Sequence, residues 1–373
     1  LLFGAANGIF SATFNNYLSE VHQLDAESRG WLEFPREFPG FLIILVSLGL
    51  LAFMRETKMA AAAMLLTAAG ALGLGFVARD MAPLVVFIII WSLGDHIIFS
   101  VEDAIGLRLA KEGGSGRRLG QLGGARNLGT IAGVGLIYLM ARAVGNRYDI
   151  FYLAAAAFAL LAGMAYLQLK TGKGEARRSR FVFKKRYGIY YAISALFGLR
   201  KQIFLAFGAW VLVKIHHVDV ATIASLYFIA AVLGVVARPL LGDVIDWFGE
   251  RAVLAADEIL IILVCLAYAF AGDIFSGSTV VHVLYGAFIL DSVLFALRIA
   301  RNTYLKKIVE DPQDLTPTMA LGVTIDHVVA MSLPILSGYI WAHLGFRWVF
   351  VLAATIAVAG FFVCLRIRVP RTS

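Results

Sequence analysis

Long apolar stretches, separated by short polar connections, run through almost the whole chain. A membrane-spanning helix needs about 20 mainly apolar residues. The connections carry helix-ending residues such as Asp311-Pro312 and Gly113-Gly114-Ser115-Gly116. The pattern predicts an all-α, polytopic membrane protein with twelve transmembrane helices. The predicted spans are 1–20, 30–53, 59–78, 82–107, 119–142, 148–169, 187–214, 220–241, 252–272, 279–304, 316–342 and 347–367.

One long polar segment interrupts this pattern near the middle of the chain. Residues 170–186, KTGKGEARRSRFVFKKR, contain eight Lys or Arg residues among 17. Positive charge on short loops marks the cytoplasmic side of a membrane, whose inner leaflet is anionic. A solvated linker is the plainer interpretation. With six spans on each side, the segment predicts a cytoplasmic loop between a six-helix bundle over 1–169 and a second bundle over 187–373.

The other cations predict how the chain crosses the membrane. With the N-terminus inside, the inner segments hold 20 Lys and Arg residues and the outer segments hold 6. Cytoplasmic loops carry the excess of Lys and Arg in membrane proteins. We therefore expect an integral, multi-pass protein with both termini in the cytoplasm, in a plasma membrane such as the bacterial inner membrane.

Composition excludes several other classes of protein. Sixty per cent hydrophobic and 16% charged residues rule out an ordinary soluble domain. The net charge of +8 is spread over short gaps between apolar runs, so we expect no nucleic-acid partner. Cys265 and Cys364 each lie inside an apolar run and indicate neither a disulfide framework nor a metal site. Without a phosphate-binding Gly-Lys-Ser/Thr loop or a nucleophile elbow, the sequence predicts no enzyme and no cofactor.

The two halves of the chain repeat each other. VHQLDAES at 21–28 matches IHHVDVAT at 215–222, an offset of 194, and Asp95 matches Asp291, an offset of 196. GNRYDIFYLAA at 145–155 also resembles GFRWVFVLAA at 345–354. Apolar sequence produces chance matches, but here their order is preserved and the offset drifts slowly. The pattern indicates parallel six-helix repeats, as in one class of secondary transporter.

The segment GDVIDWFGER at 242–251 carries the most specific motif. It resembles the Gly-x-x-x-Asp-x-x-Gly-x-Arg loop signature of the major facilitator superfamily, with Gly242, Asp246, Gly249 and Arg251 in place. Glycines permit a tight turn, and an Asp can meet a helix N-terminus; an ordinary loop is the alternative. The equivalent loop in the first half, MRETKMA at 54–60, lacks the Gly and the Asp. The resemblance covers essentially the whole chain and implies the superfamily fold of two pseudo-symmetric six-helix bundles.

A weaker resemblance concerns the fifth predicted span. Gly120, Gly129 and Gly133 match the glycine spacing of a signature found in antiporters of the superfamily. The proline of that signature is replaced by Val134, and its closing glycine pair is absent. Small residues every fourth position also serve close helix packing. The resemblance therefore favours export only slightly.

Ionisable residues inside the spans supply the candidate site, because such groups are costly in a membrane and usually face a cavity or each other. Asp95 and Asp291 are equivalent in the repeat and share a helix stripe with Phe99 and Phe295, respectively. A carboxylate beside a histidine can pass a proton near neutral pH, although a histidine in a helix is more often a packing residue. The cavity candidates for substrate and protons are Asp95, Arg126, Asn127, Arg200, Lys201, Asp291, Asp326 and His327.

Other charges inside the spans are candidates for gates. Near the predicted outer end of 30–53, an outer gate and a self-neutralising cluster are both compatible with the spacing. Four further charges lie closer to the cytoplasm and predict an inner salt-bridge gate. The outer group is Glu33, Arg36 and Glu37, and the inner group is Glu102, Asp103, Arg298 and Arg301.

Together these features predict a secondary transporter that moves a small organic solute by alternating access. We expect a proton gradient to drive it through a buried carboxylate, with a slight preference for efflux. The buried cations favour an anionic group on the substrate, whereas the acids favour a cation or a proton, so the substrate's charge stays open. A non-transporting receptor or scaffold with the same helices is the alternative. The expected partners are the solute, protons and membrane lipids, and the expected state is a monomer.

Overall fold

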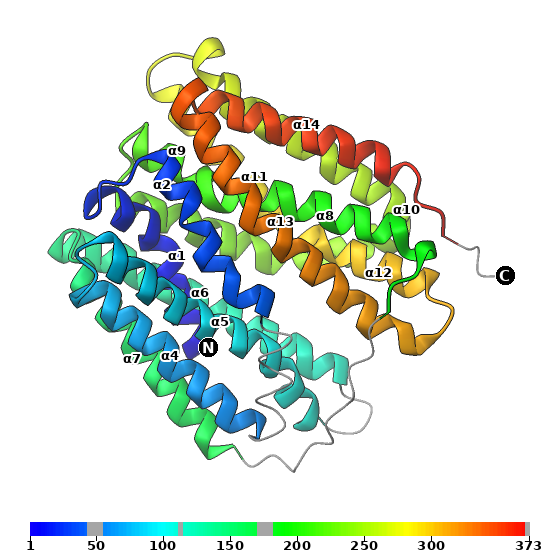
Figure 1. Cartoon of the computed structure of the whole chain (residues 1–373), viewed down its shortest axis with the longest axis horizontal. Helices are drawn as coiled ribbons and strands as arrows, with labels where there is room; N and C mark the ends of the chain where they lie inside the picture. Colours follow the sequence, from blue (N-terminus) through cyan, green and yellow to red (C-terminus); the bar gives the residue numbers. More distant parts are fainter. Residues whose placement is uncertain (43–54, 111–114, 170–181, 370–373) are drawn as a thin grey trace. The chain divides into compact units, whose positions relative to one another are not determined.

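The computed structural model describes residues 1–42, 55–110, 115–169 and 182–369 and is almost entirely helical (Figure 1). Among these residues, ten helices are long and apolar enough to cross a membrane, from Glu56–Phe76 to Phe346–Cys364. They correspond to the third to twelfth predicted spans. A helix suits this environment because it satisfies its backbone hydrogen bonds internally, where lipid offers no partners. The prediction of an all-α, multi-pass membrane protein is confirmed.

The first two predicted spans differ from the other ten. The first forms α1 (Leu2–Glu20), a helix whose Asn7, Asn15 and Asn16 reduce its apolar character. The second begins with α2 (Ala26–Trp31) and continues as a helix over 33–42. Its remainder, like 170–181 of the predicted central loop, lies outside the described residues. The described helices are consistent with twelve spans.

Contacts between residues divide the chain into two compact units. Each takes most of its helices from one of the sequence halves, 1–169 or 187–373. Unit 1 also contains Val218–Ala231, and unit 2 also contains Asp25–Phe34. The helices of unit 1 are α1, α4 (Glu56–Phe76), α5 (Met81–Arg108), α6 (Ser115–Val144), α7 (Tyr148–Gln168) and the start of α10 (Val220–Ile274). Unit 2 contains α2, α8 (Gly188–Ile203), α9 (Ala209–Lys214), the rest of α10, α11 (Ser278–Leu294), α12 (Arg298–Ile308), α13 (Leu315–Leu344) and α14 (Phe346–Cys364).

Small residues let the helices of unit 1 approach one another closely. Within this unit, α4 packs against α5 and α7, and α1 packs against α6 and α7 (Figure 1). Gly4 and Gly8 of α1 lie directly against the backbone of α6, and Gly129 and Gly133 of α6 lie against the backbone of α1. A Cβ at any of the four would collide with the facing helix. This is the small-residue packing that membrane helices use in place of a hydrophobic driving force.

In unit 2, α13 is the helix around which several others pack. It contacts α2, α8 and α14, and α8 also contacts α14. Gly30 of α2 fits against the Pro334 carbonyl of α13, and Gly198 of α8 fits against Asp326 of α13. The latter contact brings a carboxylate directly onto the surface of α8.

Two of the predicted spans are broken by local irregularities, and a third break separates two spans. A π-helical turn at Phe204–Gly208 separates α8 from α9, and a 3-10 turn at Phe295–Leu297 separates α11 from α12. The long helix α10 is interrupted at Gly249, which has φ 77° and ψ 158°, so it contains two spans. Interruptions of this kind are frequent at functional sites, and the first two lie within one turn of Lys201 and Asp291.

The matching turns at 21–28 and 215–222 adopt the same local conformation. Gln23 has φ 50° and His217, its counterpart in the repeat, has φ 52°. Two residues further on, Asp25 and Asp219 each accept a hydrogen bond from a backbone N–H three residues ahead, at 2.8 and 2.6 Å. Both carboxylates therefore cap a helix N-terminus, and the repeat extends from sequence to local structure.

The cap at Asp25 gives a test with a pH signature. Asp25→Ala removes the acceptor and should cost about 1 kcal/mol of stability at neutral pH. The Ser28 backbone N–H lowers the pKa of Asp25, so the stabilising charge is present above the unfolded pKa and is lost as pH falls below about 4. The difference in thermal unfolding midpoint between wild type and Asp25→Ala should shrink at acid pH. Asp25→Asn, which keeps an uncharged cap, is the control. A difference that is unchanged at acid pH would contradict the role of the charge.

Candidate functional site

In unit 1, the predicted stripe on α5 meets α1 and α6. Asp95 accepts a hydrogen bond from the amide of Asn7 at 2.9 Å. No described cation lies within ion-pair distance of this carboxylate. One to two turns further along α5, Arg126 of α6 donates to Glu102 at 2.9 Å and lies 5.2 Å from the Phe99 ring centroid. The structure thus joins a cavity candidate, Arg126, to a gate candidate, Glu102.

A cavity of about 320 Å³ lies beside this ion pair in unit 1, and both Glu102 and Arg126 line it. Asn127 is turned elsewhere and donates to the Ala231 carbonyl at 3.2 Å. Asp103, the neighbouring gate candidate, is exposed. The two acids at the end of the stripe therefore have different surroundings.

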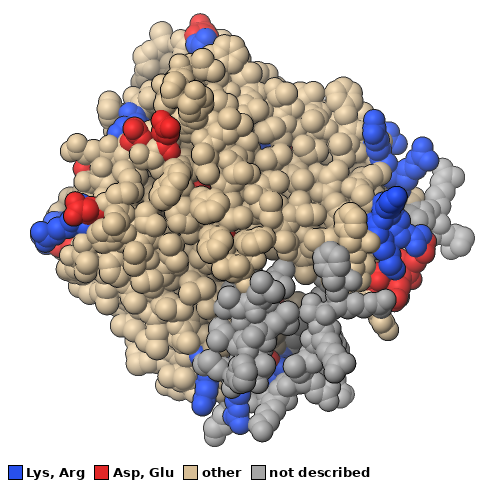
Figure 2. Space-filling model, in the orientation of Figure 1, with Lys and Arg blue, Asp and Glu red and all other residues tan. Residues whose placement is uncertain are grey.

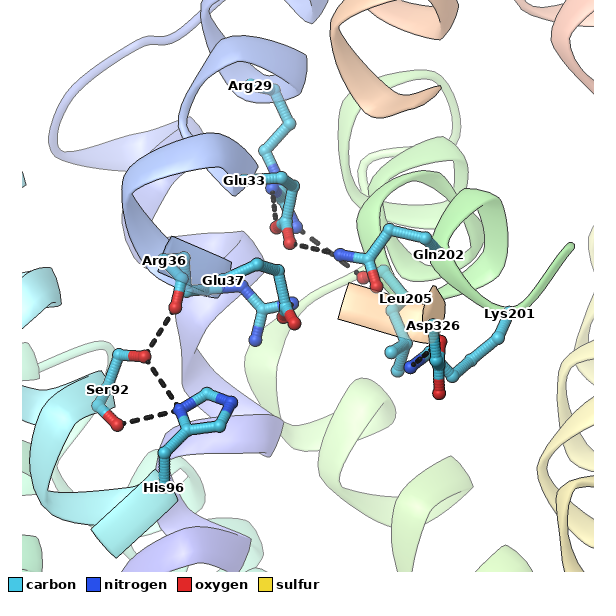
Figure 3. A network of polar contacts seen from close by, with 10 residues as sticks. All are labelled: Arg29, Glu33, Arg36, Glu37, Ser92, His96, Lys201, Gln202, Leu205 and Asp326. Atoms are coloured by element: carbon cyan, nitrogen blue, oxygen red, sulfur yellow. Dashed lines mark hydrogen bonds and ion pairs between the residues drawn. The ribbon is translucent and has the colours of Figure 1, made fainter. Parts of the chain in front are cut away.

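The outer candidates on the second span form separate pairs. In unit 2, Glu33 is fully buried, pairs with Arg29 one turn earlier and accepts a hydrogen bond from Gln202 (Figure 3). In unit 1, Arg36 pairs with the adjacent Glu37 at 2.8 Å. The sequence analysis overlooked Arg29, whose side chain is buried although it stands in a predicted outer segment.

Figure 3 also draws a contact in unit 1 that sequence analysis did not foresee. The Ser92 hydroxyl donates to the Arg36 carbonyl and lies 3.1 Å from Nδ1 of His96. Ser92 is buried and His96 is half-buried. His96 directly follows Asp95 in the sequence, but its counterpart in the repeat, Ser292, is not a histidine.

In unit 2, Lys201 of α8 and Asp326 of α13 form a close ion pair of 2.8 Å (Figure 3). Their side chains are 11% and 13% exposed, so the pair is largely withdrawn from solvent. The absence of a side chain at Gly198, one turn before Lys201, leaves the space that Asp326 occupies. His327, the next residue on α13, is half-buried.

Arg200, the neighbour of Lys201, lies in a second and more acidic group. Its guanidinium is buried and lies 3.5 Å from Asp257 of α10. Glu258 and Asp291 are also close enough to act on it electrostatically. Asp257 and Glu258 are buried, whereas Asp291 is half-buried. Three carboxylates therefore surround a single guanidinium; we refer to Arg200, Asp257, Glu258 and Asp291 as the acidic cluster.

Two members of the acidic cluster were missed from the sequence. Asp257 and Glu258 stand side by side inside the predicted span 252–272, and adjacent acids in a span are themselves a signal of function. The structure adds that Glu258 packs against Gly360 of α14, where a Cβ would collide with its carboxylate. The glycine leaves room for the acid to reach the interior of the unit.

A second buried arginine, Arg301, lies against the same aromatic ring as Arg200. The guanidinium groups of Arg200 and Arg301 lie 5.1 and 4.8 Å from the ring centroid of Phe197. In each, Nε and Nη1 are buried and donate no hydrogen bond to the described residues. By contrast, Arg298, the other gate candidate of this helix, is exposed and lies over Phe295 at 5.1 Å. Buried N–H groups of this kind favour an anionic ligand or water.

Comparisons with known proteins identify the family. The sequence matches the profile of the Major Facilitator Superfamily over residues 1–297. The chain belongs to the major facilitator superfamily. Among curated protein sequences, none matches it significantly.

Solved structures of superfamily transporters share its fold. A mutant of the nucleoside transporter NupG has a TM-score of 0.79 at 14% identity, covering 98% of this chain and 97% of its own. The D-xylose-proton symporter gives 0.73 at 16% identity, covering 99% and 95%. A bacterial homologue of the lysosomal transporter Spinster gives 0.74 at 14% identity, covering 98% and 94%. Membership of the superfamily, together with this fold, supports a secondary transporter rather than an enzyme.

Of the two glycines in the superfamily loop signature, only Gly249 makes the tight turn that the sequence predicts. Gly249 adopts a positive φ, which an L-residue rarely tolerates, and there the chain turns between two spans. Gly242 lies in regular helix with open space around it, and Asp246 and Arg251 are exposed. In the antiporter-like signature, Gly129 and Gly133 pack α6 onto α1, whereas Gly120 has no near neighbour. Two of those three glycines thus have a packing role.

We expect the contributions of Lys201 and Asp326 to stability to be strongly coupled. Lys201→Met or Asp326→Leu alone should lower stability by about 3–5 kcal/mol, because each leaves an uncompensated charge. The double variant should recover most of that loss, since it leaves no unpaired charge. Denaturant unfolding of the purified protein in detergent measures the cycle. The exposed pair Arg147–Asp149 is the control, and Arg147→Met there should leave stability almost unchanged, because solvent screens the pair. Additive losses at Lys201 and Asp326 would refute the coupling.

Proposed function

We propose that this protein is a proton-coupled secondary transporter that moves a small organic solute by alternating access. Membership of the superfamily supports transport, and the acidic cluster supports the choice of a proton as the coupling ion. Efflux is the preferred direction, on the partial match of the fifth span to the antiporter signature. The gates would be formed by the charged residues named above near the two ends of the spans.

The observation that carries proton coupling is the excess of acid around Arg200. If Asp257, Glu258 and Asp291 were all ionised, the cluster would hold two more negative than positive charges, in a region where charge is poorly solvated. A bound proton reduces that excess. Protonation and release would therefore change the electrostatic energy of the site substantially, as coupling to a gradient requires.

The three acids singled out from the sequence differ in their suitability for this role. Asp326 is held by Lys201 at 2.8 Å and resembles a permanent ion pair. Asp95 accepts an amide hydrogen bond and pairs with no cation of the described residues. Asp291 combines partial exposure with an acidic neighbour, Asp257, and a cation, Arg200, that the two acids share. We therefore favour Asp291, backed by Glu258 and Asp257, as the point at which the proton enters.

The buried arginines point to the substrate's chemistry. The partnerless Nε and Nη1 groups of Arg200 and Arg301 suit the oxygens of a carboxylate or phosphate. Phe197 between them provides an apolar face. A substrate anion that engages Arg200 would compete with the carboxylates for this cation, which links substrate binding to protonation.

Solute flux into proteoliposomes, with and without an imposed pH gradient, tests the proposal directly. The panel should include nucleosides and D-xylose, which are the solutes named for two structural neighbours, and small carboxylates and phosphate esters. Accumulation that follows the pH gradient supports proton-coupled transport. Flux of no solute would favour a receptor or scaffold, and flux that ignores the pH gradient would exclude a proton as the driving ion.

Substitution of Asp291 separates coupling from binding. In Asp291→Asn, gradient-driven accumulation should fall about tenfold, within the usual range of coupling between sites, while exchange at equal pH persists. Glu258→Gln should show the same separation to a smaller extent. Asp80→Asn, at an exposed acid between two predicted spans, is the matched control and should keep both reactions. If Asp291→Asn, Asp95→Asn and Asp326→Asn all retain gradient-driven accumulation, the proton is carried elsewhere.

The loop signature predicts an effect on the access equilibrium. Asp246 is exposed near a helix break, where a carboxylate stabilises a helix N-terminus by about 0.3–1 kcal/mol. Asp246→Asn should therefore slow transport roughly two- to fivefold by shifting the balance of access states, with folding intact. Transport rates and thermal unfolding measured on the same preparation decide this. Wild-type rates in the variant would reject the role.

A further inference from the structure

A cavity of about 720 Å³ opens at one end of unit 2, away from the acidic cluster. Four segments meet there: the turn before α8, the part of α10 after Gly249, the end of α12 and the residues that follow α14. Each of three segments contributes arginine, and the fourth contributes Tyr304 and Ile308. Figure 2 shows Lys and Arg side chains gathered at the end of the molecule where α12 and α14 finish. The lining arginines are Arg186, Arg251, Arg366 and Arg368.

All the charged residues that line this cavity are positive. No Asp or Glu is among its lining residues. Arg186 is paired with Glu310 on the exposed surface, and the nearby Glu250 is engaged by Lys307 at 2.7 Å. Arg251, Arg366 and Arg368 form no ion pair with the described part of the chain. Several guanidinium groups held close together repel one another, so an anion that they share would relieve that repulsion.

The lining residues and the volume of the cavity indicate what kind of ligand it binds. A guanidinium binds phosphate oxygens through two parallel hydrogen bonds, which makes arginine the preferred residue for phosphate recognition. The volume lies within the range of about 300–1,000 Å³ found for small-molecule sites. Between the arginines, Ile189, Ile308, Leu365 and Ile367 give the wall an apolar part. A ligand with a phosphate group and an attached hydrocarbon matches both.

We propose that this cavity, the arginine pocket, binds the phosphate headgroup of an anionic phospholipid. Basic pockets at the ends of membrane helices meet the headgroup layer, where anionic lipids concentrate on the cytoplasmic side. The excess of Lys and Arg in the predicted inner segments places this end of unit 2 in that leaflet. The arginines hold the headgroup, and the isoleucine and leucine side chains contact the first part of the acyl chains. The pocket shares Arg251 with the loop signature, but its test measures lipid binding and does not depend on the proposed substrate.

Lipid binding is measured on the full chain, purified in a neutral detergent, by thermal stabilisation during titration. Phosphatidylglycerol should raise the unfolding midpoint in a saturable manner, whereas phosphatidylcholine, which carries a phosphate but no net charge, should not. Added salt should weaken the effect, because the contacts are partly exposed. Inorganic phosphate and glycerol phosphate form the second arm, and neither should compete at equal concentration without acyl chains.

The decisive variant is Arg366→Gln combined with Arg368→Gln. Each arginine near a charged headgroup contributes about 1 kcal/mol, so the half-saturating concentration of phosphatidylglycerol should rise roughly tenfold or more. Arg79→Gln combined with Arg142→Gln removes the same charge from exposed positions in unit 1 and should leave binding unchanged. Arg366→Lys with Arg368→Lys keeps the charge and should give an intermediate loss.

Several outcomes would overturn the proposal. Equal half-saturation in the Arg366/Arg368 variant and in the control would show that the pocket does not bind lipid. Equal stabilisation by phosphatidylcholine would remove charge as the basis of recognition. Competition by inorganic phosphate at the same concentration would identify a soluble phosphate, rather than a lipid, as the ligand. A fold defect in the glutamine variant would appear as a lower midpoint without lipid, and the lysine variant then provides the comparison.

Discussion

A guanidinium inside a membrane protein must find negative charge within the protein, because lipid offers none. Arg200 meets this constraint on α8, where acids from the neighbouring helices lie close to it. Asp257 approaches from α10 at 3.5 Å, with Glu258 and Asp291 close enough to contribute. The acids of the cluster outnumber its cation, and in the proposed transport cycle a bound proton reduces the excess of negative charge.

The two halves of the repeat place different buried polar contacts at matching positions. Asn7 and Lys201 are equivalent in sequence, as are Asp95 and Asp291. In unit 1 the amide of Asn7 donates to Asp95, a neutral partner for an acid. In unit 2, Lys201 reaches instead to Asp326 on α13, and Asp291 shares the field of Arg200. The backbone repeats, but the second half has replaced an amide contact with an ionic network.

Glycines set the distances on which these networks depend. Without a side chain at Gly198, Asp326 can lie against α8 and reach Lys201, and without one at Gly360, Glu258 can turn inward. Gly249 has a different role, because its positive φ turns the chain so that Arg251 joins the arginine pocket. Substitution at these positions would act on the charges through geometry, although none of the glycines carries a charge.

The sequence by itself determined the membrane class, ten spans that the structure describes, the repeat and half of the Asp, Glu and Arg residues that are buried in the described part of the chain. It could do so because lipid imposes a length of apolar helix and makes each buried charge rare enough to notice. The choice of partners was decided only by the tertiary structure. Which carboxylate faces Lys201, and which face Arg200, depends on helix rotation and on contacts between distant segments. The π-helical turn at Phe204–Gly208 and the convergence of four segments on the arginine pocket are likewise products of packing, for which no local pattern in the sequence exists.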